Sequence, residues 1–479
     1  MQNIVRRSLS YLVLCSVLGA AGISSAEEHW FEKFKNSASD RELYAFLYAM
    51  PKGGDLHNHL SGAAFSEWWY EFALAEAENG YVYYTKVKIN NCREYGTNEF
   101  SRDPYLLLFR NVQESTYNTL SECEKTEYKK LQTLSEKEKT GWLNSLRLDT
   151  AHEGRDEFFQ THWQRLNELF LNHRIQAEIL VRNMQAFAKE GLSYLEIDMT
   201  PVGVLPNGEF IDAETVYNYY LERLARKDAL ATGVTVRFHY ALLRFSPTAE
   251  QSLEQMYKFV DAHRDMYVAI DMVGREDNDK GHPLRFLETL RNLRRQYPDI
   301  ELSIHAGEVD EPNEHIRNTL LLGANRIGHG VNLLTDPDTL LLMRHNKYLI
   351  EINLVSNLLL EYIETYDQHP FPELLRIDVP VALSTDDRGM WDSILTDEFF
   401  VAVKEFNLSW DEVQTLNVNS LQHAFVQQDV KDTLLKQYGK RMQTFEKRFT
   451  SKGLGAVVKE RIETGSFICK YYELCDLKI

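Results

Sequence analysis

The sequence predicts an α/β protein built on a (β/α)8 barrel of the TIM type, with an insertion after the first strand and extra C-terminal helices. From Gly191 onward, short apolar runs rich in β-branched residues alternate with longer amphipathic segments, which is the pattern of repeated βα units. Including one run upstream, eight such runs are present. No glycine-rich phosphate loop follows the first run, which disfavours the alternative, an open doubly wound sheet.

The apolar runs are the candidate strands. They are Gly54–His57, Tyr194–Met199, Thr235–Leu242, Tyr267–Met272, Glu301–His305, Arg326–Gly328, Tyr348–Ile352 and Val379–Leu383. Segments long enough to return across a sheet as helices lie between them. They are Ala213–Ala231, Glu250–His263, Pro283–Tyr297 and Glu314–Leu322. Eight parallel strands with helical returns favour a closed barrel, whose active site lies at the C-terminal ends of the strands.

Two parts of the chain exceed a minimal barrel. Residues 81–150 separate the first strand from a helix predicted over Phe158–Phe187, and we expect an inserted subdomain there. Beyond Ser393, Glu412–Ala424 and Gln427–Phe449 are predicted as outer helices. The predicted division is an export signal at 1–26, an N-terminal segment with the first strand at 27–80, the insertion at 81–150, and the remaining barrel with its C-terminal helices at 151–479.

The N-terminus has the pattern of an export signal. Arg6 and Arg7 precede an apolar run from Leu9 to Ile23, and small residues follow up to Ala26. The run is short for a membrane span, which favours a cleaved signal over a retained anchor. The paired arginines match a twin-arginine signal only in part. We therefore expect a periplasmic or secreted protein without membrane attachment after signal removal.

The cysteines are consistent with that location. Cys15 would leave with the signal, so that Cys92, Cys123, Cys469 and Cys475 remain. An even number in an oxidising compartment indicates two disulfides, and proximity in sequence favours Cys92–Cys123 and Cys469–Cys475. Four free thiols are the alternative.

The amino-acid composition limits the classes of molecule that the protein is expected to bind. The chain of 479 residues is 44% hydrophobic and 26% charged, as expected for a globular protein. Its formal net charge of −18 disfavours nucleic acid, because such binding depends on Lys and Arg neutralising phosphates. A small neutral or cationic substrate is easier to accommodate. The outer helices and the insertion are compatible with a homodimer, although no interface is visible in the sequence.

Histidines and carboxylates follow four of the predicted strands. His57 and His59 are two positions apart, so both imidazoles share one face of a strand and can bind one ion. His305 ends another strand, and Glu308 follows it by one short turn, where it can reach a substrate. Taken alone, each motif is also consistent with packing or with a solvated turn.

Two further predicted strands end in similar groups. His329 lies between Gly328 and Gly330, which suits proton transfer as well as an ordinary turn. Asp386 and Asp387 end the last strand, and adjacent carboxylates diverge, so that one can bind metal while the other faces a different partner. Together these residues converge on the catalytic face of one predicted barrel. Imidazole and carboxylate ligands without thiolate favour one Zn²⁺ per chain, with iron, manganese or cobalt as alternatives.

Four motifs together resemble adenosine deaminases of the metal-dependent amidohydrolase superfamily. They are Met50–Gly62 (MPKGGDLHNHLSG), His305–Glu308, Arg326–Gly330 and Ser384–Asp387. The export signal, the insertion and its cysteine pair resemble the secreted adenosine deaminase growth factor branch. The resemblance implies zinc-dependent deamination of adenosine and 2′-deoxyadenosine to the inosine nucleosides plus ammonia.

The resemblance also implies roles for individual residues. The zinc ligands would be His57, His59, His305 and Asp386, and the ion would lower the pKa of a bound water. Glu308 would be protonated and donate to purine N1, and His329 would orient the attacking hydroxide. Asp387 would hydrogen-bond N7, and the backbone of Gly274 would contact N3.

The chain differs from the compact adenosine deaminases at several positions expected around the substrate. Ser61 stands where they have an aspartate that contacts the ribose 5′-hydroxyl. Trp163 is the candidate for the aromatic residue that the growth factor branch places at the sugar, and a core tryptophan is the alternative. Arg388 replaces the usual proline after the paired aspartates, and a Cys-Pro pair is missing from the strand that ends at Glu351-Ile-Asn-Leu.

Two other functions remain open at this point. One is a related amidohydrolase that acts on adenine or a modified purine. The other is an extracellular binding or signalling protein of the growth factor type with a silent site. All four implied metal ligands are present, which favours an enzyme.

Overall fold

The computed structural model describes residues 29–92, 97–98, 101–102, 106–150, 153–278, 280–309, 311–458 and 461–478. The predicted export signal therefore lies outside the described residues. No helix in the described part of the chain combines the length and apolar character that a membrane crossing requires.

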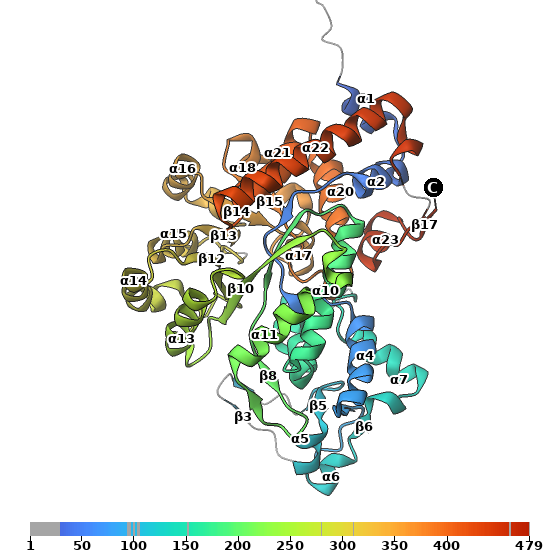
Figure 1. The fold of residues 1–479 in the computed structure, drawn as a ribbon, viewed down its shortest axis with the longest axis vertical. Coiled ribbons are helices and arrows are strands. Elements are labelled where there is room, and N and C mark those ends of the chain that lie inside the picture. The colour runs from blue at the N-terminus through green and yellow to red at the C-terminus, as the bar shows by residue number, and fades with distance from the viewer. Residues whose placement is uncertain are drawn as a thin grey trace, which may run out of the picture.

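Eight parallel strands form the centre of the molecule (Figure 1). In their order around the sheet they are β1 Gly54–Asp55, β7 Tyr194–Asp198, β10 Thr235–Leu243, β11 Tyr267–Val273, β12 Glu301–Ala306, β13 Arg326–His329, β14 Leu349–Ile352 and β15 Val381–Leu383. Asn58 pairs with Asp386 in parallel and closes the ring between its first and last strands. The (β/α)8 barrel predicted from the sequence is confirmed.

The observed strands match the predicted runs, with small differences at their ends. The first strand is shorter than predicted and ends at Asp55. The last strand begins at Val381 instead of Val379, because Pro380 has no amide hydrogen to donate to a neighbouring strand.

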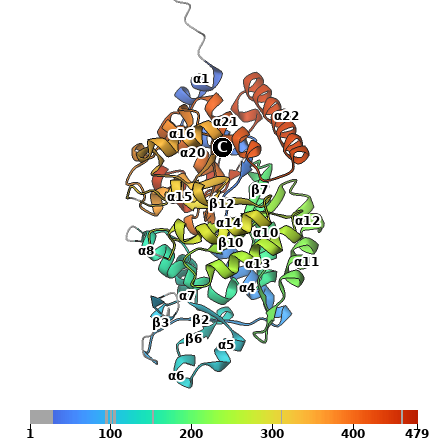
Figure 2. The same ribbon diagram turned by 90° about the vertical axis from the view of Figure 1, so that its left-hand side faces the viewer.

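Helices surround the barrel (Figures 1 and 2). The helices after β7 are α11 Ala213–Leu224, α12 Lys227–Leu230, α13 Ala249–Ala262, α14 Leu287–Gln296, α15 His315–Leu322, α16 Pro337–Asn346, α17 Leu354–Leu359, α18 Phe371–Arg376, α19 Arg388–Trp391 and α20 Leu395–Phe406. The predicted outer helices are α21 Trp410–Gln422 and α22 Gln428–Lys452. One predicted helix, Ala213–Ala231, is divided into α11 and α12.

The single helix predicted over Phe158–Phe187 is wrong. The chain instead forms a π-helical turn at Phe158–His162, α9 Trp163–Leu166, a 3₁₀ turn at Asn167–Leu169 and then α10 His173–Lys189. Asn167 has a positive φ of 41°. The Asn172 side chain accepts hydrogen bonds from the amides of Arg174 and Ile175, so it starts a new helix instead of continuing the old one.

The N-terminal helices pack on the C-terminal ones. They are α1 Trp30–Ser37 and α2 Asp40–Ala49, followed after β1 by α3 Leu60–Ala63 and α4 Ser66–Ala75. Trp30 and Phe46 contact the rings of Trp410 in α21 and Phe449 in α22, with centroids 4.8–5.7 Å apart. Such aromatic packing fixes the two ends of the chain to each other.

A small antiparallel sheet lies outside the barrel at the opposite end of the molecule from α1 (Figures 1 and 2). Its strands are β5 Asn111–Gln113, β2 Tyr83–Lys86 and β6 Tyr128–Lys130, and its helices are α5 Glu114–Thr119, α6 Glu122–Lys125 and α7 Glu136–Asn144. Tyr84, Val112 and Tyr128 form a separate core. The Cys92–Cys123 disulfide links this region internally, and Cys469–Cys475 flanks α23 Ser466–Tyr472. Both pairings agree with the prediction.

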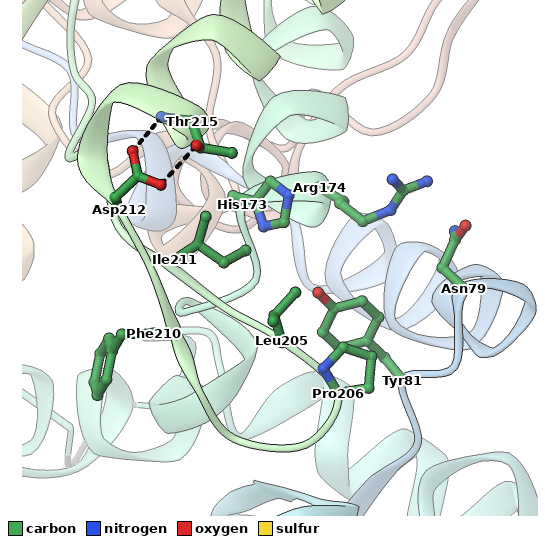
Figure 3. Close-up of a pocket in the computed structure, with 10 residues that line it drawn as sticks. All are labelled: Asn79, Tyr81, His173, Arg174, Leu205, Pro206, Phe210, Ile211, Asp212 and Thr215. Carbon is green, nitrogen blue, oxygen red and sulfur yellow. Dashed lines mark hydrogen bonds between the residues drawn. The ribbon is translucent and has the colours of Figure 1, made fainter.

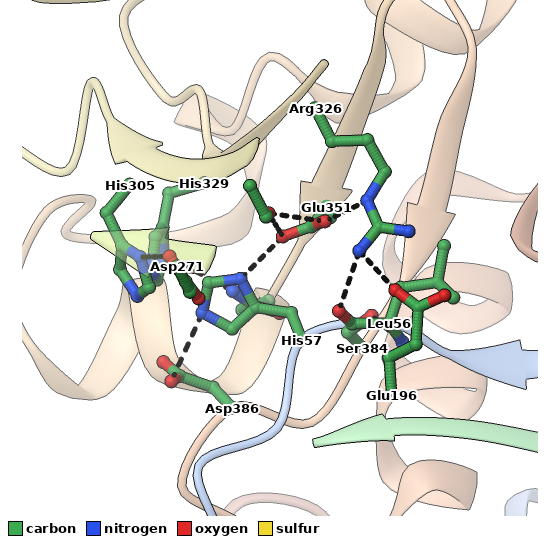
Figure 4. A network of polar contacts seen from close by, with 12 residues as sticks. Leu56, His57, Glu196, Asp271, His305, Arg326, His329, Glu351, Ser384 and Asp386 are labelled. Atoms are coloured by element: carbon green, nitrogen blue, oxygen red, sulfur yellow. Dashed lines mark hydrogen bonds and ion pairs between the residues drawn. The ribbon is translucent and has the colours of Figure 1, made fainter. Parts of the chain in front are cut away.

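A buried charge network fills the barrel below the mouth (Figure 4). Arg326, 1% exposed, forms ion pairs with Glu196 at 2.5 Å and with Glu351 at 2.6 Å. Its guanidinium also lies 3.7 Å from the ring centroid of Phe425. Burial opposes ionisation of Glu196, but the charge of Arg326 outweighs it and holds the pKa of that carboxyl well below its usual value.

We expect Arg326→Met to destabilise the fold strongly, because it leaves two buried carboxylates without their cation. The expected loss of unfolding free energy is about 3–5 kcal/mol, measured by urea denaturation. Arg317→Met is the matched control, since Arg317 pairs with Asp336 at the surface and should change stability little. Equal losses in the two variants would contradict a structural role of the network.

Candidate active site

Four ligand-type groups meet at the C-terminal ends of the strands. Nε2 of His59 lies 3.1 Å from Oδ1 of Asp386 and 3.2 Å from Nε2 of His305, and Nε2 of His57 lies 3.6 Å from the same carboxylate oxygen. Figure 4 shows His57, His305 and Asp386 pointing toward one another. The structure therefore brings together the four residues that the sequence predicts as metal ligands.

Each of the three imidazoles is oriented by a buried carboxylate. Nδ1 of His57 lies 2.8 Å from Glu351, and Nδ1 of His305 lies 3.1 Å from Asp271. Nδ1 of His59 contacts Asp198. These partners hold the proton on Nδ1 and leave Nε2 as a metal ligand. The sequence analysis missed all three carboxylates, although acidic residues within otherwise apolar strands are a detectable signal.

The geometry of the cluster fits a divalent ion. Ligand atoms about 2.0–2.1 Å from a tetrahedral ion lie about 3.3–3.4 Å from one another, close to the separations observed here. Nε2 of His57 is buried and has no hydrogen-bond partner. A buried polar atom without a partner lowers the stability of the fold unless a ligand binds to it. Imidazole and carboxylate donors suit zinc among the common divalent ions.

Glu308 and His329 lie beside the cluster. Both side chains are buried, and Nε2 of His329 lies 3.7 Å from Oε1 of Glu308. Burial, together with the negative charges of Asp386 and Glu276, raises the pKa of Glu308 to about 8. A carboxyl that stays protonated at neutral pH can act as a general acid.

A chain of hydrogen bonds orients His329. Nδ1 of His329 lies 3.0 Å from Nδ2 of Asn357, whose Oδ1 lies 3.1 Å from Nε2 of His369. Because the amide nitrogen donates, His329 accepts at Nδ1 and carries its proton on Nε2, the atom that faces Glu308. Burial lowers the pKa of His329 well below its usual value, so the ring is neutral. Sequence reasoning did not identify Asn357.

The two aspartates have different environments. Burial opposes ionisation of Asp386, but its close contacts with His57 and His59 outweigh that effect and hold its pKa well below the usual value. Burial and the neighbouring charge of Asp386 raise the pKa of Asp387 well above its usual value. A Cβ at position 62 would lie 1.6 Å from Oδ1 of Asp387. Gly62 is therefore required for the close approach of this side chain.

Backbone strain is concentrated in the same residues. His329 and Asp386 have positive φ values of 65° and 54°, which are unfavourable for residues with a Cβ. Such conformations persist where surrounding structure enforces them, and they are frequent in active sites.

The three residues predicted at the substrate rim are less tightly connected to the cluster. Gly274, at φ 87°, follows β11, and a Cβ there would lie 2.8 Å from Phe245. The carbonyl of Ser61 accepts a hydrogen bond from Nε1 of Trp69 at 3.2 Å. Trp163 packs on Phe158, with centroids 5.8 Å apart.

Glu276 is a further residue that the sequence analysis missed. Its Oε1 accepts the backbone amide of Glu308 at 2.7 Å, and its Oε2 lies 3.1 Å from Nδ1 of His315. The carboxylate is 2% exposed. It therefore fixes the turn that carries Glu308 and adds negative charge next to it. The only sequence signal is its position two residues after Gly274.

A closed (β/α)8 barrel, with imidazoles and a carboxylate converging at its mouth and a protonated acid beside them, defines a metal-dependent hydrolase. A family model described as adenosine deaminase matches residues 143–440, more than half of the sequence. The chain belongs to the adenosine deaminase family, a family of metal-dependent amidohydrolase enzymes.

Relatives and structural neighbours agree with this assignment. An adenosine deaminase of Plasmodium gallinaceum is 27% identical over 57% of this chain and 75% of that protein. An N6-methyl-AMP deaminase-L of Xenopus laevis is 27% identical over 52% of this chain and 71% of that protein. A crystal structure of an amidohydrolase from Burkholderia ambifaria with bound zinc has a TM-score of 0.57 at 16% identity, and the match covers 86% of this chain and 95% of that one. That structural likeness shows the fold.

We expect Glu276→Gln to shift the pH dependence of catalysis. Removing the negative charge makes ionisation of Glu308 easier and lowers its pKa, so the protonated form is lost at a lower pH. The alkaline limb of the kcat/KM profile should move to lower pH. Glu314→Gln, an exposed acid next to His315, is the control. An unchanged alkaline limb in Glu276→Gln would argue against this electrostatic role.

Proposed function

We propose that the chain is a zinc-dependent adenosine deaminase, which hydrolyses adenosine to inosine and ammonia and acts on 2′-deoxyadenosine in the same way. The main support is the buried carboxyl of Glu308 with its raised pKa, next to four converging metal-ligand atoms. Protonation of a purine ring nitrogen requires such an acid, which favours a purine substrate.

His57, His59, His305 and Asp386 would hold the ion. When bound, zinc supplies a water that is acidic enough to be a nucleophile at neutral pH. Asp198, Asp271 and Glu351 would keep the three imidazoles in the ligating tautomer.

The reaction replaces a C6–N bond with a C6–O bond. Glu308 would donate its proton to N1, which makes C6 electrophilic. The oxygen of water adds at C6. One proton of that water leaves with the amino group as ammonia, and the other restores the carboxyl of Glu308. His329 carries its proton on Nε2 and can donate to the added oxygen, which stabilises negative charge in the adduct.

Asp387 and Gly274 would recognise the remaining edge of the purine. The raised pKa of Asp387 keeps its carboxyl protonated, so it can donate a hydrogen bond to N7, which only accepts. The backbone of Gly274 would contact N3. Ser61 and Trp163 are the candidates for contacts to the ribose.

The charges near the mouth favour a nucleoside over a nucleotide. Arg275, which follows Gly274, is paired with Asp277 and Asp156, both at 2.5 Å. Arg155 lies over the ring of Tyr362, 4.9 Å from its centroid. A substrate phosphate would have to compete with the two carboxylates that pair with Arg275, in a chain of net charge −18.

Absorbance assays of the zinc-loaded protein test this proposal. Adenosine and 2′-deoxyadenosine should be converted, whereas AMP and N6-methyl-AMP should be poor substrates. Glu308→Gln should reduce kcat by at least about 10²–10⁴-fold, because it removes the general acid, while the zinc content stays at one per chain.

Each other outcome has a definite meaning. Loss of zinc in Glu308→Gln would mean that Glu308 is a ligand instead of an acid. Preference for adenine would indicate the related amidohydrolase, and no turnover of any purine by zinc-loaded protein would favour an extracellular binding or signalling protein.

We also propose that the protein is exported and that it resembles the secreted growth factor branch in this respect. The two disulfides support this proposal, because they persist in oxidising compartments. Thiol titration of native, unreduced protein purified from the exported fraction should detect no free thiol. One reactive thiol would indicate that Cys15 is retained, and four would contradict the disulfides.

A further inference from the structure

Two cavities outside the candidate active site differ in their charge. One, of about 590 Å³, lies beside the hairpin of β8 Gly203–Val204 and β9 Phe210–Ile211 (Figure 3). Its Arg174 is paired with Glu76 at 2.9 Å, and its Asp212 caps α11 by accepting from Thr215. The charged groups of this cavity are therefore already used in internal contacts.

The other cavity, of about 340 Å³, lies between the end of α2 and the outer helix α22. Three cationic side chains line it, Lys440, Arg441 and Arg448. Residues 440, 441, 444 and 448 follow helical spacing, so they lie on one side of α22. Phe445 and Val457 add an apolar wall.

Neutral acceptors hold both guanidinium groups in place. Arg441 donates from Nη1 to Oγ of Ser193 at 2.8 Å and from Nη2 to the carbonyl of Gly191 at 2.6 Å. Arg448 donates to the carbonyl of Ala456. These bonds orient the cations without neutralising them, and the remaining N–H groups stay available to a ligand.

No carboxylate in the described part of the chain lies within ion-pair distance of these three cations. By contrast, Arg223 and Arg285, which are also on helices, each pair with a carboxylate at 2.7 Å or less. Burial lowers the pKa of Arg441, and the nearby Tyr438 opposes this effect only in part. Three cations without a carboxylate partner among the described residues stand out in a chain of net charge −18.

We propose that this cavity binds a small molecule carrying a phosphate or sulfate group. Fixed guanidinium groups match the geometry of tetrahedral oxyanions, and a charge-assisted hydrogen bond to such a group is stronger than a neutral one. Arg441 and Arg448 would contact the oxyanion, and Lys440 would add a third positive charge. The apolar wall of Phe445 and Val457 would face the organic part of the ligand.

Calorimetric titration of the full chain at fixed ionic strength tests this site. The probes are inorganic pyrophosphate and a sulfated disaccharide, which separate a phosphate ester from a sulfated sugar as the source of the oxyanion. We expect saturable binding of at least one probe at one site per chain. The double variant Lys440→Gln/Arg448→Gln should weaken it at least tenfold without changing the melting temperature.

The control is Lys227→Gln/Arg291→Gln, which makes the same change of charge at exposed positions outside the cavity. It should leave binding unchanged. The proposal is overturned if neither probe binds saturably, or if both double variants weaken binding equally, which would indicate attraction to overall charge only. Deaminase activity is not the readout, so the result is independent of the proposed function.

Discussion

The closure of the barrel between its first and last strands is the constraint on which both fold and site depend. The amide of Asp386 donates to the carbonyl of His57 at 2.9 Å, and the amide of His59 donates back to the carbonyl of Asp386 at 3.3 Å. The same two hydrogen bonds that complete the ring therefore set two imidazoles and a carboxylate side by side. Residues that are more than 300 positions apart become neighbours through backbone pairing alone.

The interior charges extend this constraint into the core. Glu351 lies between Arg326 on one side and His57 on the other, so one carboxylate belongs both to the buried ion-pair network and to the support of the site. Ser303 donates to the same carboxylate at 2.9 Å. In surroundings of low dielectric constant, a buried polar group without a partner lowers the stability of the fold. A network in which every group has a partner is rigid. The orientation of the imidazole is therefore coupled to the integrity of the barrel.

The sequence predicts correctly those parts of the fold and site that depend on neighbouring residues in the chain. The strands follow from runs of apolar residues, and the histidines and aspartates follow from their places at strand ends. Glu276 and Asn357 were missed because their roles depend on contacts with Glu308 and His329, which no local pattern reveals. The continuous helix predicted before β7 was wrong because the Asn172 cap overrides a helical apolar pattern.

The side chains that fill the interior of the barrel also determine from which side a ligand reaches the candidate site. Arg326 is buried against the ring of Phe425, and Glu196 beside it is inaccessible to solvent, so these side chains fill the axis of the barrel below the histidine cluster. A molecule that binds at the histidine cluster therefore has to reach it from the C-terminal ends of the strands.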